Sequence, residues 1–193
     1  MNTAARTKPR SLGAQSDSLL SWPLVTIAAT SLSAGIVVGG LAYLDRSPQR
    51  APYVGGTAAW APHIALLLLT AVGVTVMVRR RGADAVLLML LAPLGPTAAR
   101  RLANTVASIL RHPTALLRLL LGVLPLAMLV FGPFRVGVQI LGGLDPNFTV
   151  NAWGGPTYLG AMACHYLDAV LLMAAAAALL NKLLLPAAHG TRR

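Results

Sequence analysis

The chain has 193 residues, of which 56% are hydrophobic and only 11% are charged, and its formal net charge is +11. A soluble domain is ordinarily about 25% charged, so the composition excludes a protein that exposes most of its surface to water. A charge of this size would indicate nucleic-acid binding in a soluble protein. Here the basic residues cluster beside apolar segments, where they set topology and meet head groups, and we expect no nucleic-acid partner.

Four long apolar segments predict four membrane-spanning helices. They cover residues 22–44, 60–78, 119–141 and 157–180. Each is close to the length of about 20 residues that a helix needs to cross the hydrocarbon core. In the third span, Pro125 and the Gly132-Pro133 pair predict a kink or a break. The expected fold is therefore an all-α bundle of four transmembrane helices.

Two shorter helices are expected between the second and third spans, on the cytoplasmic side. Residues 85–96 are apolar but short, and a crossing there would put arginine clusters on opposite faces of the membrane. We therefore expect a buried or re-entrant segment. Residues 97–112 alternate apolar and polar faces at helical spacing, which predicts an interfacial amphipathic helix. The basic residues of its polar face are expected to contact anionic lipid head groups: Arg100, Arg101 and Arg111.

The basic residues also predict the orientation of the membrane domain, residues 22–185. With the tail 1–21 and the tail 186–193 in the cytoplasm, 13 of the 16 lysines and arginines are cytoplasmic. Positive residues are enriched in cytoplasmic loops, so the sequence predicts an even number of spans. A composition rich in Arg, Ala, Gly and Pro indicates a bacterial genome, and the expected location is the bacterial plasma membrane.

The outer half of the fourth span carries a candidate polar cluster. Asp168 lies roughly 16 Å from the outer end of this span, where a carboxylate is costly unless it is paired or neutral. His165 shares its helix face, and Tyr158 lies two turns further out on nearly the same line. Arg135 in the third span is the expected partner. The cluster is expected either to join the two spans as a structural network or to handle a proton or a ligand.

No cofactor or metal is expected. The nearest further metal ligands, His63 and Cys164, do not complete a coordination set with His165 and Asp168. The sequence lacks nucleotide-binding, hydrolase-elbow, zinc-protease and paired-cysteine motifs. Whether the chain is an enzyme therefore stays open.

The outer loop at 142–156 is dense in glycine, proline and asparagine, which predicts a defined shape. Its candidate residues are Asp145, Asn147, Asn151 and Trp153. The loop is expected to be either a lid or recognition loop over the polar cluster, or a connector whose tryptophan anchors at the membrane interface.

Small residues four positions apart in the first span predict a close helix contact: Ser31, Gly35 and Gly39. The contact is expected either within the chain, with the run Ala174–Ala178 as a smooth partner surface, or between two copies.

The leading expectation for function is an accessory or scaffold subunit of a bacterial cell-envelope or transport assembly, with a membrane-protein partner or a homo-oligomer. One alternative is a transporter or permease component that uses the outer polar cluster. Another is a membrane enzyme that acts on a lipid-linked substrate, with His165 and Asp168 as acid and base.

Overall fold

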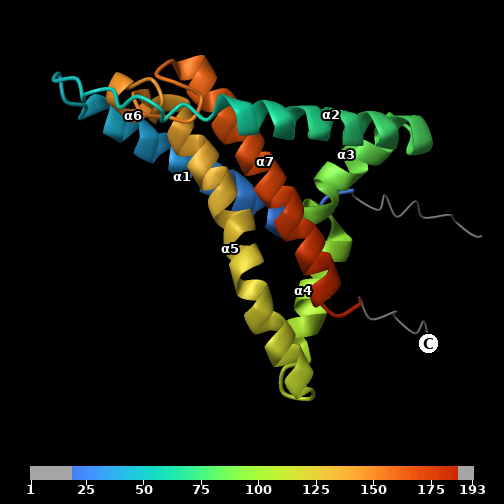
Figure 1. Cartoon of the computed structure of the whole chain (residues 1–193). Coiled ribbons are helices and arrows are strands. Elements are labelled where there is room, and N and C mark those ends of the chain that lie inside the picture. Colours follow the sequence, from blue (N-terminus) through green and yellow to red (C-terminus); the bar gives the residue numbers. More distant parts are fainter. Residues whose placement is uncertain (1–18, 187–193) are drawn as a thin grey trace, which may run out of the picture.

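The computed structural model describes residues 19–186, and every regular element in that range is a helix (Figure 1). The predicted tails, 1–21 and 186–193, lie outside the described residues apart from 19–21 and 186. The long helices are α1 (Trp22–Leu44), α2 (Trp60–Arg81), α5 (Pro113–Gly142) and α7 (Tyr158–Leu183). The short ones are α3 (Ala83–Leu91), the 3₁₀ turn η1 (Ala92–Leu94), α4 (Pro96–Ala107) and α6 (Pro146–Thr149).

The predicted all-helical membrane class is confirmed, because five helical segments are long and apolar enough to cross a membrane. Four are the long helices, and the fifth is Ala83–Ala107, which combines α3, η1 and α4. The turn at η1 divides this fifth segment into helices of 9 and 12 residues. Either piece alone is shorter than the about 20 residues that a crossing requires. The chain is a multi-pass membrane protein.

The helix α5 continues through Pro125 and Pro133, so of the kink or break predicted there the break does not occur. A proline in a helix frees a carbonyl oxygen in the preceding turn, and a neighbouring Ser or Thr hydroxyl can satisfy it. Here the hydroxyl of Ser31 on α1 donates to the carbonyl oxygen of Val130, three residues before Pro133. This bond ties α1 to α5 within one turn of Pro133, next to the carbonyl oxygen of Leu129 that the proline leaves without its helical donor.

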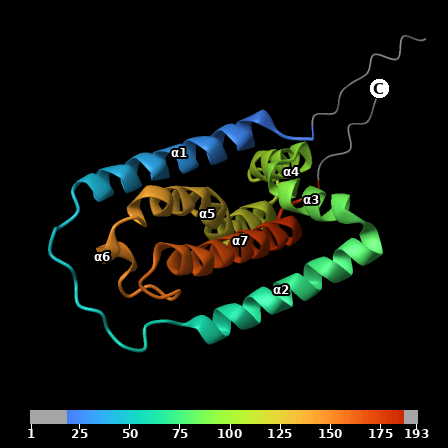
Figure 2. The same ribbon diagram turned by 90° about the horizontal axis from the view of Figure 1, so that it is seen from above.

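The helices α1 and α5 pack side by side and run in the same direction (Figure 2). Gly35 lies against Phe134 and Gly39 against Val138, so the residue numbers rise together along both helices. A Cβ atom on either glycine would collide with the α5 backbone. The small-residue face of α1 is therefore an internal packing face. Its partner is α5 and not the expected run Ala174–Ala178 of α7.

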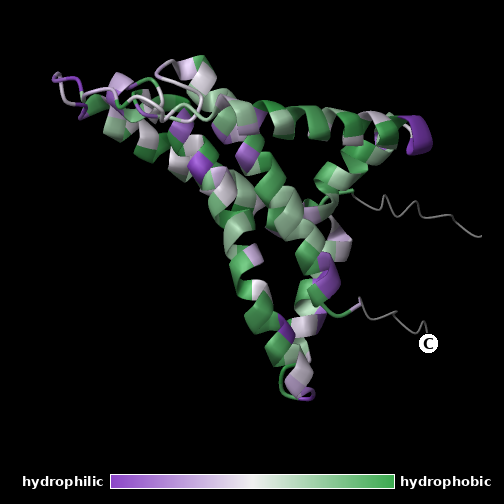
Figure 3. Ribbon diagram, viewed as in Figure 1, coloured by the Kyte–Doolittle hydropathy of each residue, from purple (hydrophilic) through white to green (hydrophobic). Residues whose placement is uncertain are grey.

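The helices α2 and α7 run in the opposite direction to α1 and α5 (Figure 2). Near its first turns α2 lies against α7, and its axis then diverges from the rest of the chain (Figure 1). The surface of α2 is apolar along most of its length and ends in the polar tip formed by Arg79–Arg81 (Figure 3).

Candidate functional site

An ion pair joins α2 to α7 where the two helices meet. His63 lies in the first turn of α2 with only 6% of its surface exposed. Its Nε2 atom is 3.2 Å from Oδ2 of Asp168, in the middle of α7. Among residues 19–186 this is the one ion pair. The expected hydrogen-bond partners of Asp168 were Arg135 or His165, and the structure assigns that place to His63 instead.

The two contacts of His63 suit a hydrogen bond at each of its ring nitrogens. Its Nδ1 atom is 2.6 Å from the carbonyl oxygen of Ala59, which only accepts, so Nδ1 carries a hydrogen. Nε2 then faces a carboxylate oxygen, and a hydrogen bond there needs one more proton. The proton rests either on the imidazole, giving a cation beside a carboxylate, or on Asp168, giving two neutral groups. In both states the pair has no net charge.

One side of this pair is covered by the segment 143–157, which connects α5 to α7. The ring of Trp153 lies 5.5 Å from the ring of His63, centroid to centroid. The carbonyl oxygen of Trp153 accepts the N–H of Ala59 at 2.7 Å. Ala59 therefore binds the loop through its N–H and His63 through its carbonyl oxygen. The expected interfacial tryptophan takes part in the site by holding the histidine in place.

A cavity of about 140 Å³ adjoins His63 between α2 and α7. Its lining residues are Trp60, His63, Ile64, Leu67, Ala163, Cys164 and Leu167. The imidazole is the one strongly polar group in this wall, and the remainder is apolar except for the buried thiol of Cys164. The cavity therefore suits an apolar group such as an acyl chain, with the imidazole of His63 as a proton-carrying group at its edge.

Of the other predicted members of the cluster, His165 lies near this pair, whereas Tyr158 lies at the start of α7. His165 is partly buried on α7, and the charges of Arg135, Asp168 and His63 are all close enough to act on it electrostatically. Arg135 itself is exposed on α5. Tyr158 donates its hydroxyl hydrogen to the carbonyl oxygen of Ile140 at 3.2 Å, which ties α7 to α5. His63 thus completes a cluster of which the sequence predicted only part.

A buried glutamine near the outer end of α5 was also missed. Gln139 is 1% exposed, and neither polar atom of its side chain has a hydrogen-bond partner among the described residues. An unpaired buried amide is costly, and more so in a lipid environment. The sequence signal was a lone amide in an apolar span, which by itself indicates nothing about its partners.

The segment 45–59, between α1 and α2, is joined to the segment 143–157, between α5 and α7, by the side chains of Asn147 and Asn151. Oδ1 of Asn147 accepts the N–H of Ala51 at 2.8 Å, and Oδ1 of Asn151 accepts the N–H of Val54 at 2.8 Å. Their amide nitrogens donate to further carbonyl oxygens of the same loop: Ser47, Gln49 and Pro52. Asp145 caps α6 by accepting the N–H of Asn147 at 2.9 Å. The residues proposed for a recognition loop are therefore engaged in bonds within the chain.

On the opposite end of the bundle, α4 holds the last turn of α7. Arg101 donates to the carbonyl oxygens of Leu184 at 2.8 Å and Leu185 at 3.2 Å, and also to the side chain of Asn181. The hydroxyl of Thr105 accepts the N–H of Leu185 at 3.0 Å. Two more donors bind neighbouring carbonyl oxygens, namely Asn104 to Pro186 and Arg118 to Leu183. Arg101, expected at lipid head groups, is thus occupied by protein, whereas Arg100 and Arg111 are exposed.

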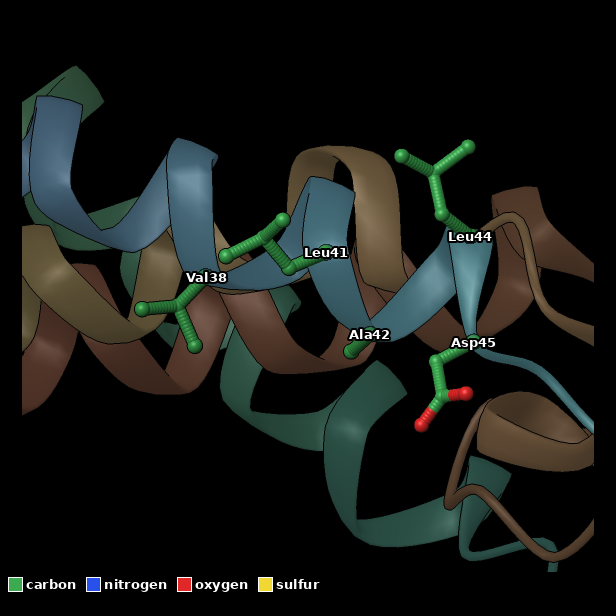
Figure 4. Close-up of a pocket in the computed structure, with 5 residues that line it drawn as sticks. All are labelled: Val38, Leu41, Ala42, Leu44 and Asp45. Atoms are coloured by element: carbon green, nitrogen blue, oxygen red, sulfur yellow. The ribbon is translucent and has the colours of Figure 1, made fainter.

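A second, open hollow of about 630 Å³ lies on the last two turns of α1 (Figure 4). Its lining residues are Val38, Leu41, Ala42, Leu44 and Asp45. A single carboxylate among aliphatic side chains does not provide the arrangement of polar groups that a catalytic or binding site needs. No protein family, curated protein or solved structure matches this chain, so the interpretation of its polar site rests on geometry.

Proposed function

We propose that this chain is a non-enzymatic subunit of the bacterial plasma membrane that packs against a partner membrane protein through α2. The observation that carries the proposal is that α2 meets the other long helices mainly near its first turns, at α7, while its far end contacts only the short helix α3 that follows it in the sequence. Near the start of α2, the polar side chains bond other parts of the same chain. His63 bonds Asp168, and Asn147 and Asn151 bond the segment 45–59 between α1 and α2. This use of polar groups is typical of a scaffold.

Four crossings with both ends in the cytoplasm are supported by the direction of the helices. Because α1 and α5 pack in parallel, they cross the membrane in the same sense. One crossing by α2 between them satisfies this condition, whereas an additional crossing by Ala83–Ala107 would reverse α5. The N–H of Ser21 at the start of α1 also donates to the carbonyl oxygen of Leu94 at 2.7 Å. The midpoint of the fifth segment therefore lies at the cytoplasmic end of α1, which favours an interfacial or re-entrant position for α3 and α4.

The surface of α2 supports a partner. Four consecutive residues, Leu66 to Leu69, are all exposed, and successive residues of a helix point about 100° apart. The middle of α2 is therefore uncovered on every side, including the side that faces its own bundle. Helices in membranes associate through close packing, and the exposed middle of α2 lacks it. A partner helix seated against α2 would supply the missing packing.

Site-specific photo-crosslinking tests this proposal in the cell. A photoreactive residue in place of Leu69 on α2 is expected to give a protein adduct of one defined mass. The same residue in place of Leu121, which is exposed on α5, serves as the matched control and is expected to label lipid. The adduct partner should also copurify in fixed stoichiometry after extraction in a mild detergent. Equal labelling from both positions, with the chain purifying alone, would contradict the proposal.

The shared proton of the His63–Asp168 pair favours a second candidate, a transporter or permease component. The pair adjoins a cavity, and a proton can move between Nε2 of His63 and Oδ2 of Asp168 without changing the net charge of the pair. A membrane enzyme with a lipid-linked substrate would use the same pair as acid and base. Both alternatives require activity from the chain itself. Proton-coupled flux or lipid turnover by the purified protein in liposomes, abolished by Asp168→Asn, would replace the scaffold proposal.

A further inference from the structure

Arg135 is a cation without a counter-charge in the outer half of the membrane domain. It lies seven residues before the end of α5 at Gly142, or about 10 Å along the helix axis. Its side chain is exposed, and it forms no ion pair or hydrogen bond with any residue from 19 to 186. A lone arginine at such a position is unfavourable unless it reaches the head groups or meets an anion.

The nearby acid does not neutralise this arginine. The carboxylate of Asp168 is paired with His63 on α2 and forms no ion pair with Arg135 among the described residues. His165 lies within electrostatic reach of Arg135, but an imidazole adds either nothing or a second positive charge. Arg135 therefore presents a positive charge and hydrogen-bond donors on the exposed surface of α5, within electrostatic reach of His165.

An apolar stripe runs from Arg135 toward the middle of the membrane. Phe131, Met128 and Leu124 precede it at helical spacing, and they are 55%, 36% and 67% exposed. Residues at this spacing lie on one face of a helix. The cation of Arg135 thus lies at the outer end of an exposed stripe whose other three residues are all hydrophobic. This is the order of groups in a phospholipid: an anionic phosphate outside and an acyl chain directed inward.

We propose that Arg135, assisted by His165, binds the phosphate of an anionic phospholipid in the outer leaflet, with an acyl chain along Phe131, Met128 and Leu124. Charge complementarity selects this occupant, because lipid is the medium that covers the exposed stripe and its phosphate supplies the missing anion. The site combines Arg135 of α5 with His165 of α7 and is separate from the partner surface in the middle of α2. The proposal rests on the orientation of the spans and not on the scaffold function.

The full chain in a neutral detergent, titrated with phosphatidylglycerol and observed by native mass spectrometry, tests the site. Arg135→Gln is expected to weaken retention of the most tightly bound lipid about five- to tenfold, which corresponds to the loss of one basic contact. Arg135→Lys should retain most of the affinity because it keeps the charge. Arg50→Gln, which removes an exposed arginine of the outer loop, is the matched control and should bind as the wild type does.

A second measurement needs no variant. Phosphatidylglycerol with a photoreactive group in its acyl chain should label the Leu124–Phe131 segment of the wild-type protein more strongly than the exposed Val37–Leu41 segment of α1. Labelling that is equal on both helices, or retention that is unchanged in a folded Arg135→Gln protein, would overturn the proposal. Displacement of the lipid by millimolar inorganic phosphate would assign the site to a soluble anion. Loss of a copurifying protein without loss of lipid would assign it to an acidic partner helix, and either result overturns lipid binding.

Discussion

His63 and Asp168 form the main polar bridge between two helices that otherwise diverge. Both nitrogens of the imidazole are bonded, one to Ala59 and one to Asp168, so the histidine has a fixed orientation. Removing either partner would leave a polar group in an apolar wall without a bond. Replacing both by leucine would remove that penalty while leaving the apolar contact.

The first prediction follows from this pairing. Asp168→Leu and His63→Leu should each lower the free energy of unfolding, and the double variant should lose less than the sum. Side-chain hydrogen bonds between membrane helices are worth about 1 kcal/mol, so we expect a coupling free energy of about that size. A double-mutant cycle in detergent measures it. The same cycle with Arg135 and Asp168 should show weaker coupling, and a stronger one would restore the pairing expected from the sequence.

The asparagine pair makes a second prediction with a built-in control. Asn147→Ala should accelerate hydrogen exchange of the Ala51 amide about fivefold, because a hydrogen bond of about 1 kcal/mol is lost, and should affect the Val54 amide less. Asn151→Ala should do the reverse. Amide-resolved exchange in detergent distinguishes the two. Equal acceleration of both amides by either variant would show that the loops open as one unit.

At the scale of single residues, sequence reasoning reached Asp168 but not its partner. A carboxylate in the middle of an apolar span signals a paired group, and the structure contains such a pair. His63 sits three residues from the start of its helix, whereas Asp168 sits ten residues into α7. Arg135, in the outer part of the neighbouring third span, was therefore the expected partner of Asp168, because depth was judged only by counting residues from the span ends. The offset arises because α2 meets α7 obliquely and starts beside its middle, a relation that one-dimensional depth does not contain.

Among the elements, the α1–α5 contact depends on residues without side chains. A third prediction uses the two kinds of glycine in the chain. Gly39→Ala should destabilise the protein by about 1–3 kcal/mol because its Cβ would meet the backbone of Val138. Gly73→Ala on α2, where a Cβ would meet nothing within 4 Å, should be neutral or slightly stabilising. Unfolding titrations of the two variants check this, and equal effects would contradict the packing of α1 on α5.

The α4 helix yields a fourth prediction, which separates two adjacent arginines. Arg101→Gln should expose the last turn of α7 and accelerate exchange of the Leu185 amide, because hydrogen bonds from a charged donor to two carbonyl oxygens are lost. Arg100→Gln should leave that amide protected and instead reduce binding to anionic vesicles. If both variants affected only lipid binding, the clamp on α7 would be absent in the membrane.

Helix positions were largely predictable, because hydropathy identifies the stretch that must avoid water. The bounds of α1 match the expectation at residues 22–44. The bounds of α5 do not, since it begins six residues before the predicted 119 and includes Arg118. That arginine binds the carbonyl oxygen of Leu183, so a tertiary contact extends the helix beyond its apolar core. Contacts of this kind, and the continuity of α5 through Pro133, depend on neighbours that local sequence does not reveal.

At the scale of the whole molecule, the parallel packing of α1 and α5 constrains the path of the chain. Two packed parallel helices begin on the same side of the membrane. The chain must therefore cross an odd number of times between the end of α1 and the start of α5. The positive charges lead to the same arrangement independently, with 13 of 16 basic residues on one side. Both arguments favour our proposal that α3 and α4 stay on the side of the membrane where α1 begins, although their combined length would suffice for a crossing.

Reporter fusions provide the fifth prediction and separate four crossings from five. Fusions after residues 55, 105, 150 and 186 should report outside, inside, outside and inside. If Ala83–Ala107 crossed, the last three would all be inverted, because every later segment would change sides. Inverted signals would force α1 and α5 to be antiparallel and would thus contradict the contacts of Gly35 and Gly39 as well. The fusion after residue 55 lies before the disputed segment and serves as the control, since it must report outside in either arrangement.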